Sequence, residues 1–282
     1  MFPNNLVFST VALALGVQSV DIISMDIPQV AESGKSLVLD CRFEYRAEEK
    51  DQLDIKWYFN SSPTPIYQWL PAMNTGPQVI DPRFTEYLDL LYTVNGEKYE
   101  KHRALHLVNV THHLSGSYMC KVSSFLDEDF NQKNLMVYVP PSTVKFSHES
   151  SEGEERTKIS CSADGIYPSP TARVYWKDGG LDGESAETVV EENSDGLFSI
   201  LLSTSLHTES IRGVQLGCEI SIPGTDFIIK EELVISPTIS ADPRISSGTY
   251  CINPCFLLLL LVLYCTQTVQ MYTTTPALPI HL

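Results

Sequence analysis

The chain has 282 residues, of which 43% are hydrophobic, so it can bury two cores of ordinary size and is not disordered by composition. Acidic residues outnumber basic ones by 35 to 19, which gives a formal net charge of −16. A surface of this sign repels the phosphate backbone of nucleic acids, so we expect no nucleic-acid partner.

The first 19 residues are predicted to be a signal peptide. The apolar run from Leu6 to Val17 is too short to cross a bilayer, and small residues follow it at plausible cleavage positions. The opening MFPNN carries no lysine or arginine, which leaves open that this run is the first strand of the mature protein. Two glycosylation sequons, at Asn60 and Asn109, fit an exported chain.

Four of the seven cysteines form two pairs, each with a tryptophan shortly after its first member. The pairs are Cys41 and Cys120 with Trp57, and Cys161 and Cys218 with Trp176. This is the pattern of an inter-sheet disulfide packed against a buried indole in an immunoglobulin sandwich. Each disulfide would stabilise its fold by about 4 kcal/mol in the chain-entropy model. A zinc site would need close Cys-x-x-Cys or His spacing, which is absent around these four cysteines.

Residues 20–140 are predicted to be a variable-type immunoglobulin-like domain. Alternate residues are apolar from Leu37 to Phe43 and again from Ile55 to Phe59, which predicts half-buried strands. The wide separation of the first cysteine pair leaves room for extra central strands, one of them at Ile66–Leu70. Tyr118 lies two residues before Cys120, the position of a tyrosine corner. Asn95-Gly96 predicts a hairpin turn.

Residues 141–237 are predicted to be a constant-type domain, because the second cysteine pair is closer and the same alternation recurs around it. Leu216 stands where a corner tyrosine would be. The run CSADGIYP from Cys161 to Pro168, followed by VYWKDG, resembles constant-type immunoglobulin domains.

Three segments of the first domain carry a second resemblance: IKWYFNSSPTPIYQWLP, HRALHLVNVT and LSGSYMCKV. With them the first domain resembles the insect beaten-path family of cell-surface and secreted immunoglobulin proteins. This resemblance implies a role in neuronal guidance or adhesion, through binding a larger immunoglobulin-family partner of the sidestep type.

The C-terminal part is predicted to be a stalk at 238–255, a hydrophobic anchor at 256–272 and a tail at 273–282. The apolar run Phe256–Tyr264 covers only about 14 Å as a helix, whereas a bilayer core is about 30 Å thick. A glycolipid anchor attached near Ser246, Ser247 and Gly248 competes with a spanning helix, and a secreted form is the third alternative. The fate of Cys251, Cys255 and Cys265 stays open between palmitoylation, removal with the tail, an intermolecular disulfide at Cys251, and unpaired residues without a role.

Two groups of residues in the first domain are candidates for binding a partner. Alternation predicts that an aromatic and methionine stripe faces away from the core, formed by Tyr58, Met119, Met136 and Tyr138. The acidic run Asp127, Glu128 and Asp129 is predicted in the loop between the last two strands, where it could meet a basic partner. The alternatives for the stripe are that the two domains or the Ile66–Leu70 strand cover it, or that the strand register is shifted by one residue. The alternative for the acidic run is a solvated loop.

The sequence predicts a binding protein and no enzyme. It contains no nucleophile elbow, phosphate loop, paired metal motif or carboxylate constellation, so we expect no catalytic residue, metal, cofactor or small-molecule substrate. His112 and His113, side by side on an extended chain, would point to opposite faces. The fold expected is all-β: two tandem immunoglobulin-like sandwiches with a C-terminal membrane-anchoring segment. The leading hypothesis is a cell-surface protein that binds a protein partner in trans, in adhesion or axon guidance. A secreted or immune-type ligand or decoy is the alternative, and an enzyme is a remote one.

Overall fold

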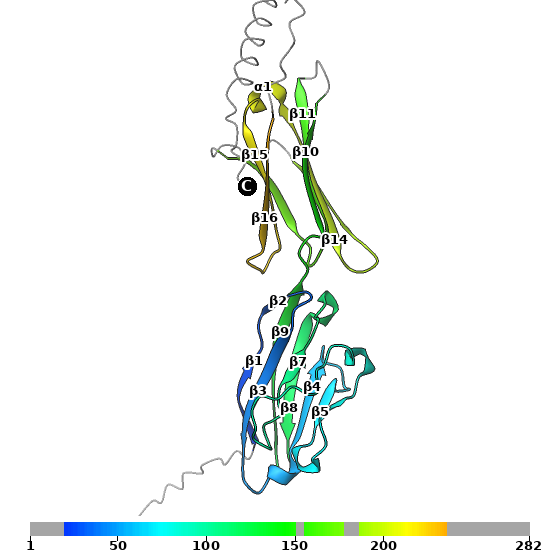
Figure 1. The fold of residues 1–282 in the computed structure, drawn as a ribbon, viewed down its shortest axis with the longest axis vertical. Helices are drawn as coiled ribbons and strands as arrows, with labels where there is room; N and C mark the ends of the chain where they lie inside the picture. The colour runs from blue at the N-terminus through cyan, green and yellow to red at the C-terminus, as the bar shows by residue number, and fades with distance from the viewer. Residues whose placement is uncertain (1–19, 151–154, 178–185, 236–282) are drawn as a thin grey trace, which may run out of the picture. The chain divides into compact units, whose positions relative to one another are not determined.

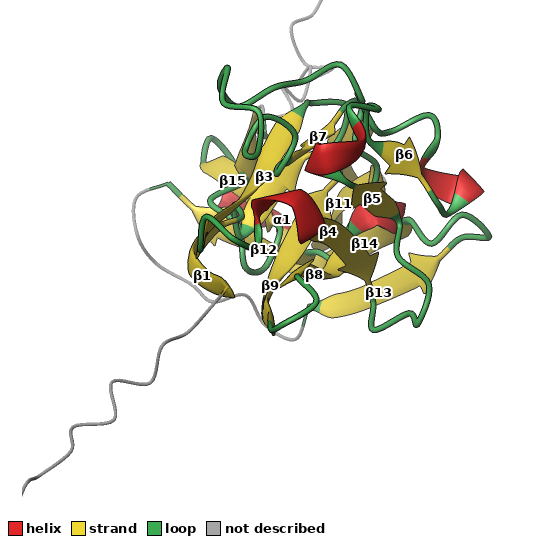
Figure 2. Cartoon of the chain, turned by 90° about the horizontal axis from the view of Figure 1, so that it is seen from below, coloured by secondary structure: helices red, strands yellow, loops and turns green. Residues whose placement is uncertain are grey.

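The computed structural model describes residues 20–150, 155–177 and 186–235, and within them strands dominate (Figures 1 and 2). The helical elements are short: η1 (Lys50–Gln52), η2 (Pro71–Met73), η3 (Pro82–Phe84), η4 (His112–Leu114) and α1 (Thr208–Ile211). The predicted signal peptide, stalk, anchor and tail lie outside the described residues, as do Ser246, Ser247, Gly248, Cys251, Cys255 and Cys265.

The strands up to residue 138 form a first sandwich of two sheets (Figure 1). One sheet has the order β1 (Val20–Asp26), β3 (Leu37–Tyr45) and β7 (Leu105–Leu107). The other has six strands, in the order β2 (Val30–Glu32), β9 (Glu128–Tyr138), β8 (Gly116–Ser123), β4 (Asp54–Phe59), β5 (Tyr67–Trp69) and β6 (Gln78–Val79). The pairing of β2 with β9 is parallel, and the other pairings in this sandwich are antiparallel.

The core of the first sandwich follows from alternation along its strands. In β3, Leu39, Cys41 and Phe43 are buried, while the charged residues between them point outward. The chain passes from one sheet to the other between β1 and β2, at Pro28, which has no N–H to donate to a ladder. The segment predicted at Ile66–Leu70 contains β5, whose Tyr67 and Trp69 are buried.

A second sandwich is built from the strands that follow residue 142. Four strands pair in the order β10 (Thr143–Glu149), β11 (Arg156–Ile166), β14 (Phe198–His207) and β13 (Glu187–Glu192). Three strands form the other sheet, in the order β12 (Thr171–Trp176), β15 (Gln215–Ser221) and β16 (Ile228–Val234). Its buried residues gather in two clusters, one around the Cys161–Cys218 disulfide and one around Ile159 and Leu216.

Three local predictions are wrong. Asn95-Gly96 is not a hairpin turn, because residues 91–104 contain no strand; Asn95 Oδ1 instead accepts a hydrogen bond from the Glu97 N–H at 2.9 Å, which closes an Asx turn. His112 and His113 lie in the 3-10 helix η4, so their rings stack with centroids 3.9 Å apart instead of diverging.

The third concerns the acidic run. Glu128 and Asp129 belong to β9, and the turn before it is closed by the Ser124 N–H, which bonds to the Asp127 carbonyl at 2.8 Å. Pairing with β8 overrides the low strand propensity of these acidic residues.

Candidate recognition site

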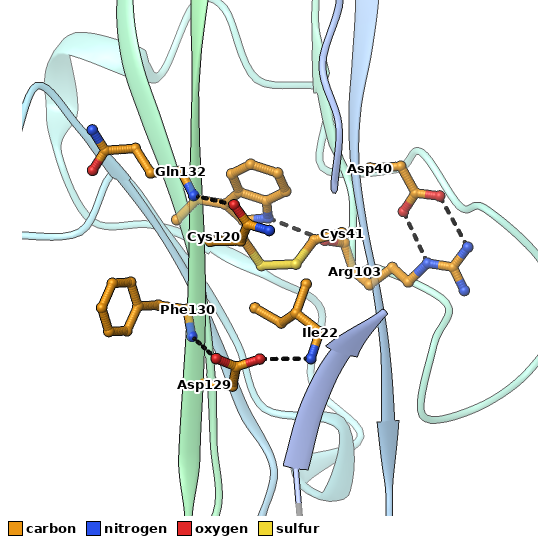
Figure 3. The surroundings of a disulfide bond; sticks show 10 residues. Ile22, Asp40, Cys41, Arg103, Cys120, Asp129, Phe130 and Gln132 are labelled. Atoms are coloured by element: carbon orange, nitrogen blue, oxygen red, sulfur yellow. Dashed lines mark hydrogen bonds and ion pairs between the residues drawn. A yellow bond between two sulfur atoms is a disulfide. The ribbon is translucent and has the colours of Figure 1, made fainter. Parts of the chain in front are cut away.

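The first disulfide and its tryptophan fix the two sheets of the first sandwich together. Cys41 on β3 is bonded to Cys120 on β8, with Cα atoms 6.4 Å apart (Figure 3). Trp57 on β4 is fully buried, and its Nε1–H donates to the Arg103 carbonyl oxygen at 3.0 Å. The disulfide and this hydrogen bond therefore hold the inner face of the six-stranded sheet in place, while its outer face stays uncovered by the other sheet.

Tyr118 has the geometry of a tyrosine corner. Its side chain is fully buried, and its hydroxyl donates to the Leu114 carbonyl oxygen at 2.8 Å. Burial raises the pKa of the Tyr118 hydroxyl far above its usual value, so it remains a donor. This bond holds the η4 turn against the start of β8.

The second sandwich repeats the disulfide with a looser tryptophan. Cys161 on β11 is bonded to Cys218 on β15, with Cα atoms 6.3 Å apart. Trp176 is only half-buried and packs against the cluster that contains Ile159 and Leu216. It contributes to the core from the end of β12, without the full burial of Trp57.

The predicted outward stripe is divided between two places. Tyr58 and Met119 lie directly opposite each other on β4 and β8, on the outer face of the six-stranded sheet. Met136 lies opposite Val30 of β2, because β8 pairs with β9 only up to Leu135. Since Gln132 is the residue of β9 opposite Met119, Met136 is four residues further along, or about 13 Å.

Tyr138 lies further still from Tyr58 and Met119. Its hydroxyl donates to Glu32 at 3.2 Å, at the end of the β2–β9 pair. The structure thus brings Tyr58 and Met119 together and places Met136 and Tyr138 elsewhere on β9.

Phe130 joins Tyr58 and Met119 on the outer face, and the alternation argument missed it. It lies opposite Lys121 on β8 and points away from the disulfide (Figure 3). Its exposed fraction is 63%, and the hairpin tip before it exposes Phe125 by 87% and Leu126 by 71%. The signal in the sequence was two phenylalanines and a leucine within six residues of a predicted hairpin loop, which a solvated turn does not need.

The acidic residues of the hairpin have separate partners. Asp129 accepts a hydrogen bond from the Ile22 N–H at 2.8 Å, which ties β9 to β1 (Figure 3). Glu128 forms an ion pair with Lys121 at 2.6 Å, and Asp127 accepts from the Glu128 N–H at 2.9 Å. Asp129 is therefore a structural acceptor, and Glu128 remains the exposed carboxylate beside Phe130.

The charges across the rest of the outer face are balanced. Lys56 pairs with Asp54 on the same strand, and Asp54 also accepts from the Gln68 side chain at 2.9 Å. Exposed apolar side chains next to paired polar groups are typical of protein–protein interfaces. We call Tyr58, Met119, Phe125, Leu126 and Phe130 the recognition face.

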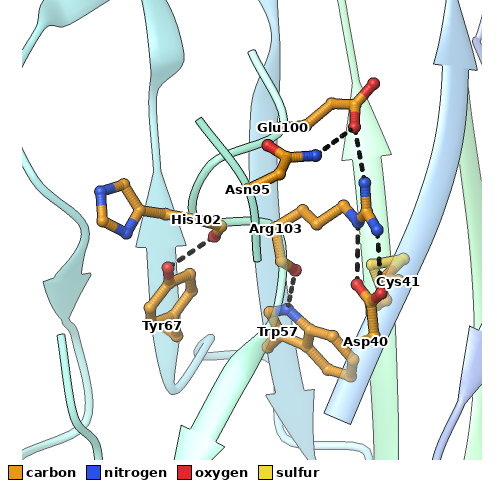
Figure 4. A network of polar contacts seen from close by, with 9 residues as sticks. Asp40, Cys41, Trp57, Tyr67, Asn95, Glu100, His102 and Arg103 are labelled. Atoms are coloured by element: carbon orange, nitrogen blue, oxygen red, sulfur yellow. Dashed lines mark hydrogen bonds and ion pairs between the residues drawn. A yellow bond between two sulfur atoms is a disulfide. The ribbon is translucent and has the colours of Figure 1, made fainter. Parts of the chain in front are cut away.

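Arg103 connects the loop that contains Glu100 to Asp40 on β3 and, through its carbonyl oxygen, to the buried Trp57 (Figure 4). Its guanidinium bonds to both oxygens of Asp40, at 2.8 and 2.9 Å, and to Glu100 at 2.7 Å. These bonds raise the pKa of the Arg103 guanidinium, chiefly through Asp40. No sequence motif marked this residue, because its partners are 63 and 3 positions away.

Both sequon asparagines are exposed. Asn60 and Asn109 have φ values of 49° and 48°, the left-handed conformation of tight turns. Asn60 accepts a hydrogen bond from the Ser117 N–H through Oδ1 at 2.9 Å. Glycosylation at either position stays a prediction.

Across the described ranges, no three His, Cys, Asp or Glu side chains are grouped as a metal site would require. The same ranges hold no helix of the length and apolar character that a membrane crossing needs.

Residues 28–129 match the family model of the immunoglobulin domain. Among solved structures, bovine butyrophilin is 18% identical with a TM-score of 0.63, over 77% of this chain and 99% of that one. A chain from the crystal structure of ICOS in complex with ICOS-L and an anti-ICOS-L VNAR domain is 20% identical with a TM-score of 0.56, over 72% of this chain and 97% of that one. No curated protein matches the sequence. The chain therefore carries an immunoglobulin domain, and its fold is all-β and immunoglobulin-like.

Proposed function

We propose that this chain is a cell-surface recognition protein that binds a protein partner through the recognition face of its first sandwich. The observation that carries the proposal is the exposure of Phe125 and Leu126 at the hairpin tip and of Phe130 on β9, which lies diagonally from Met119 on the outer face of the sheet. Large apolar side chains grouped on one face cost free energy in water and gain it when a partner covers them. Phenylalanine, tyrosine and methionine are also enriched in the cores of protein interfaces.

The domain organisation is part of the proposal. The six-stranded sheet with its added β5 and β6 supports a variable-type first domain at 20–140. The four-plus-three strand order supports a constant-type second domain at 141–237. Export through a signal peptide, and a membrane tether by a helix or a glycolipid, complete the proposed organisation.

Binding in trans, in adhesion or axon guidance, is the finer proposal. It rests on the resemblance of the first domain to the beaten-path family. The ICOS complex with ICOS-L is a pairing of two proteins by a related fold, which supports a protein as the class of partner.

The test is a binding screen of the full chain against cell-surface ectodomains, repeated with a Phe125→Ser/Leu126→Ser/Phe130→Ser variant. The three side chains are exposed, so the variant should fold, and binding to the selected partner should weaken at least tenfold. The matched control is Val189→Ser/Leu201→Ser, which removes two exposed apolar side chains from the second sandwich. A screen without any partner, or a partner that binds the triple variant as well as the wild type, would overturn the proposal.

A further inference from the structure

A groove of about 470 Å³ lies in the first sandwich, apart from the recognition face. Its wall and base come from Trp69 on β5, from the loop after it, which contains η2, and from the 93–102 loop. The residues that line it include Trp69, Gly76, Gly96, Lys98, Lys101 and His102. None of these residues belongs to the recognition face.

The wall formed by His102 is held in place from the core (Figure 4). The Tyr67 hydroxyl donates to the His102 carbonyl oxygen at 2.7 Å, and Trp57 donates to the next carbonyl, that of Arg103. The His102 ring packs edge-on against Trp69, with centroids 5.5 Å apart. A ligand would therefore meet a preformed wall and lose little free energy in ordering it.

His102 presents a hydrogen-bond acceptor. Its Nδ1 lies 2.9 Å from the Tyr92 carbonyl oxygen, which can only accept, so Nδ1 carries the proton. Burial lowers the pKa of the ring below its usual value, which favours the neutral form at physiological pH. In that form Nε2 holds a lone pair that can accept a hydrogen bond from a hydroxyl group.

Two lysines on the groove supply positive charge. Lys98 and Lys101 are exposed, and among the described residues neither has a carboxylate partner; the Lys98 ammonium lies 5.0 Å from the centroid of the Tyr99 ring. Of the two carboxylates on this loop, Glu100 is bound to Arg103 and Asn95, and Glu97 pairs with neither lysine. In a chain of net charge −16, two such ammonium groups at one groove are a local positive site.

We propose that this groove binds an acidic sugar, that is, a sugar ring that carries a carboxylate or sulfate group. The lysine ammonium groups would meet the anion, and His102 Nε2 would accept a hydrogen bond from a ring hydroxyl. The buried Trp69 packs against the His102 ring and holds it in place. The volume is within the range of small-ligand sites, roughly 300–1,000 Å³. Such a sugar can end a glycan on a glycoprotein or form the headgroup of a glycolipid.

The proposal is tested by titrating the purified full chain with 3′-sialyllactose, a glucuronate-terminated disaccharide and neutral lactose, observed by saturation-transfer NMR. At least one acidic sugar should bind, and lactose should bind at least tenfold more weakly. The Lys98→Gln/Lys101→Gln variant should lose at least tenfold in affinity. The control Lys133→Gln/Lys145→Gln, which removes the same charge from exposed positions outside the groove, should bind as the wild type does.

A second variant tests the groove itself. A Cβ at Gly96 would meet no heavy atom within 4 Å, and Gly96 does not have a positive φ, so Gly96→Leu should fold normally and fill the opening. It should abolish sugar binding with an unchanged melting temperature. Wild-type affinity in Gly96→Leu would show that the anion binds outside the groove and would overturn the proposal.

Three further outcomes are informative. Equal binding of lactose, or tighter binding of a poly-glutamate peptide than of every sugar, would overturn the assignment to an acidic sugar. Vesicles that display the sialyllactose headgroup distinguish a glycolipid source from a free glycan, and binding to either supports the groove. The Phe125→Ser/Leu126→Ser/Phe130→Ser variant should still bind the sugar, so this proposal can fail or hold independently of the protein-binding face.

Discussion

At the scale of single residues, buried aromatic side chains hold the loops of the first sandwich by bonding to backbone carbonyl oxygens. Trp57 bonds to Arg103, Tyr67 to His102 and Tyr118 to Leu114. Each bond joins a buried ring to a segment that lies outside the strands. Loss of one such bond would leave a carbonyl oxygen without a partner in an apolar environment. The free-energy cost of that unpaired oxygen exceeds the net contribution of the hydrogen bond to stability.

Tyr118→Phe tests this at the tyrosine corner. The variant keeps the ring and leaves the Leu114 carbonyl unpaired, so the free energy of unfolding should fall by about 1–2 kcal/mol. Urea denaturation of the full chain, followed by tryptophan fluorescence, measures the change. Tyr58→Phe is the control, because it removes a hydroxyl from the outer face; equal midpoints for the two variants would contradict the prediction.

His102→Asn tests the protonation of the groove wall. Burial lowers the pKa of His102 from its usual 6.5, so the unfolded chain takes up a proton at higher pH than the folded one. The contribution of this residue to stability is therefore complete above pH 6.5 and is lost as the pH falls below it. Asparagine can keep the donor to Tyr92 but does not titrate.

The melting temperature of the wild type should accordingly fall more than that of His102→Asn between pH 7.5 and pH 5.0. His148→Asn, on an exposed position of β10, is the control and should follow the wild type. Parallel pH profiles for the wild type and His102→Asn would show that His102 titrates alike in both states.

At the scale of elements, the two sheets of the first sandwich are also joined by a side chain. Asp129 on β9 accepts from the backbone N–H of Ile22 on β1, where the β1–β3 register shifts. A donor at a bulge has no ladder partner, and the carboxylate supplies one. An acidic residue in this strand is thus explained by the backbone of another strand and not by solvent exposure.

Asp129→Ala should leave the Ile22 amide without its acceptor. Its hydrogen exchange should accelerate by about tenfold, the equivalent of about 1.4 kcal/mol of local protection. Residue-resolved exchange by NMR measures this on the full chain. Glu128→Ala, which removes the neighbouring carboxylate, should leave exchange at Ile22 unchanged, and acceleration in both variants would point to general loosening of the hairpin.

At the scale of the whole molecule, the sequence was informative where a pattern is long or chemically distinctive. The all-β immunoglobulin-like fold and its disulfides could be predicted, because the spacing of cysteine and tryptophan is typical of a disulfide that joins the two sheets of a sandwich. β2 and β6 are only three and two residues long and give no alternation to detect. The outward stripe required the register between β8 and β9, which only the structure supplies, and this is why Met136 was grouped with Met119.

The parallel pairing of β2 with β9 has a mechanical consequence. Tension between residues 20 and 138 would pull these two strands along their length in opposite directions, so their hydrogen bonds would be loaded together in shear and not one after another. The bonds from Ser33 to Tyr138 and from Met136 to Gln29 lie at this pair. If the shear gave way, the Cys41–Cys120 bond would still hold closed the loop that it spans, with its sequence separation of 79. The first sandwich could therefore lengthen only by the segments outside that loop, which limits how far a stretched chain would extend.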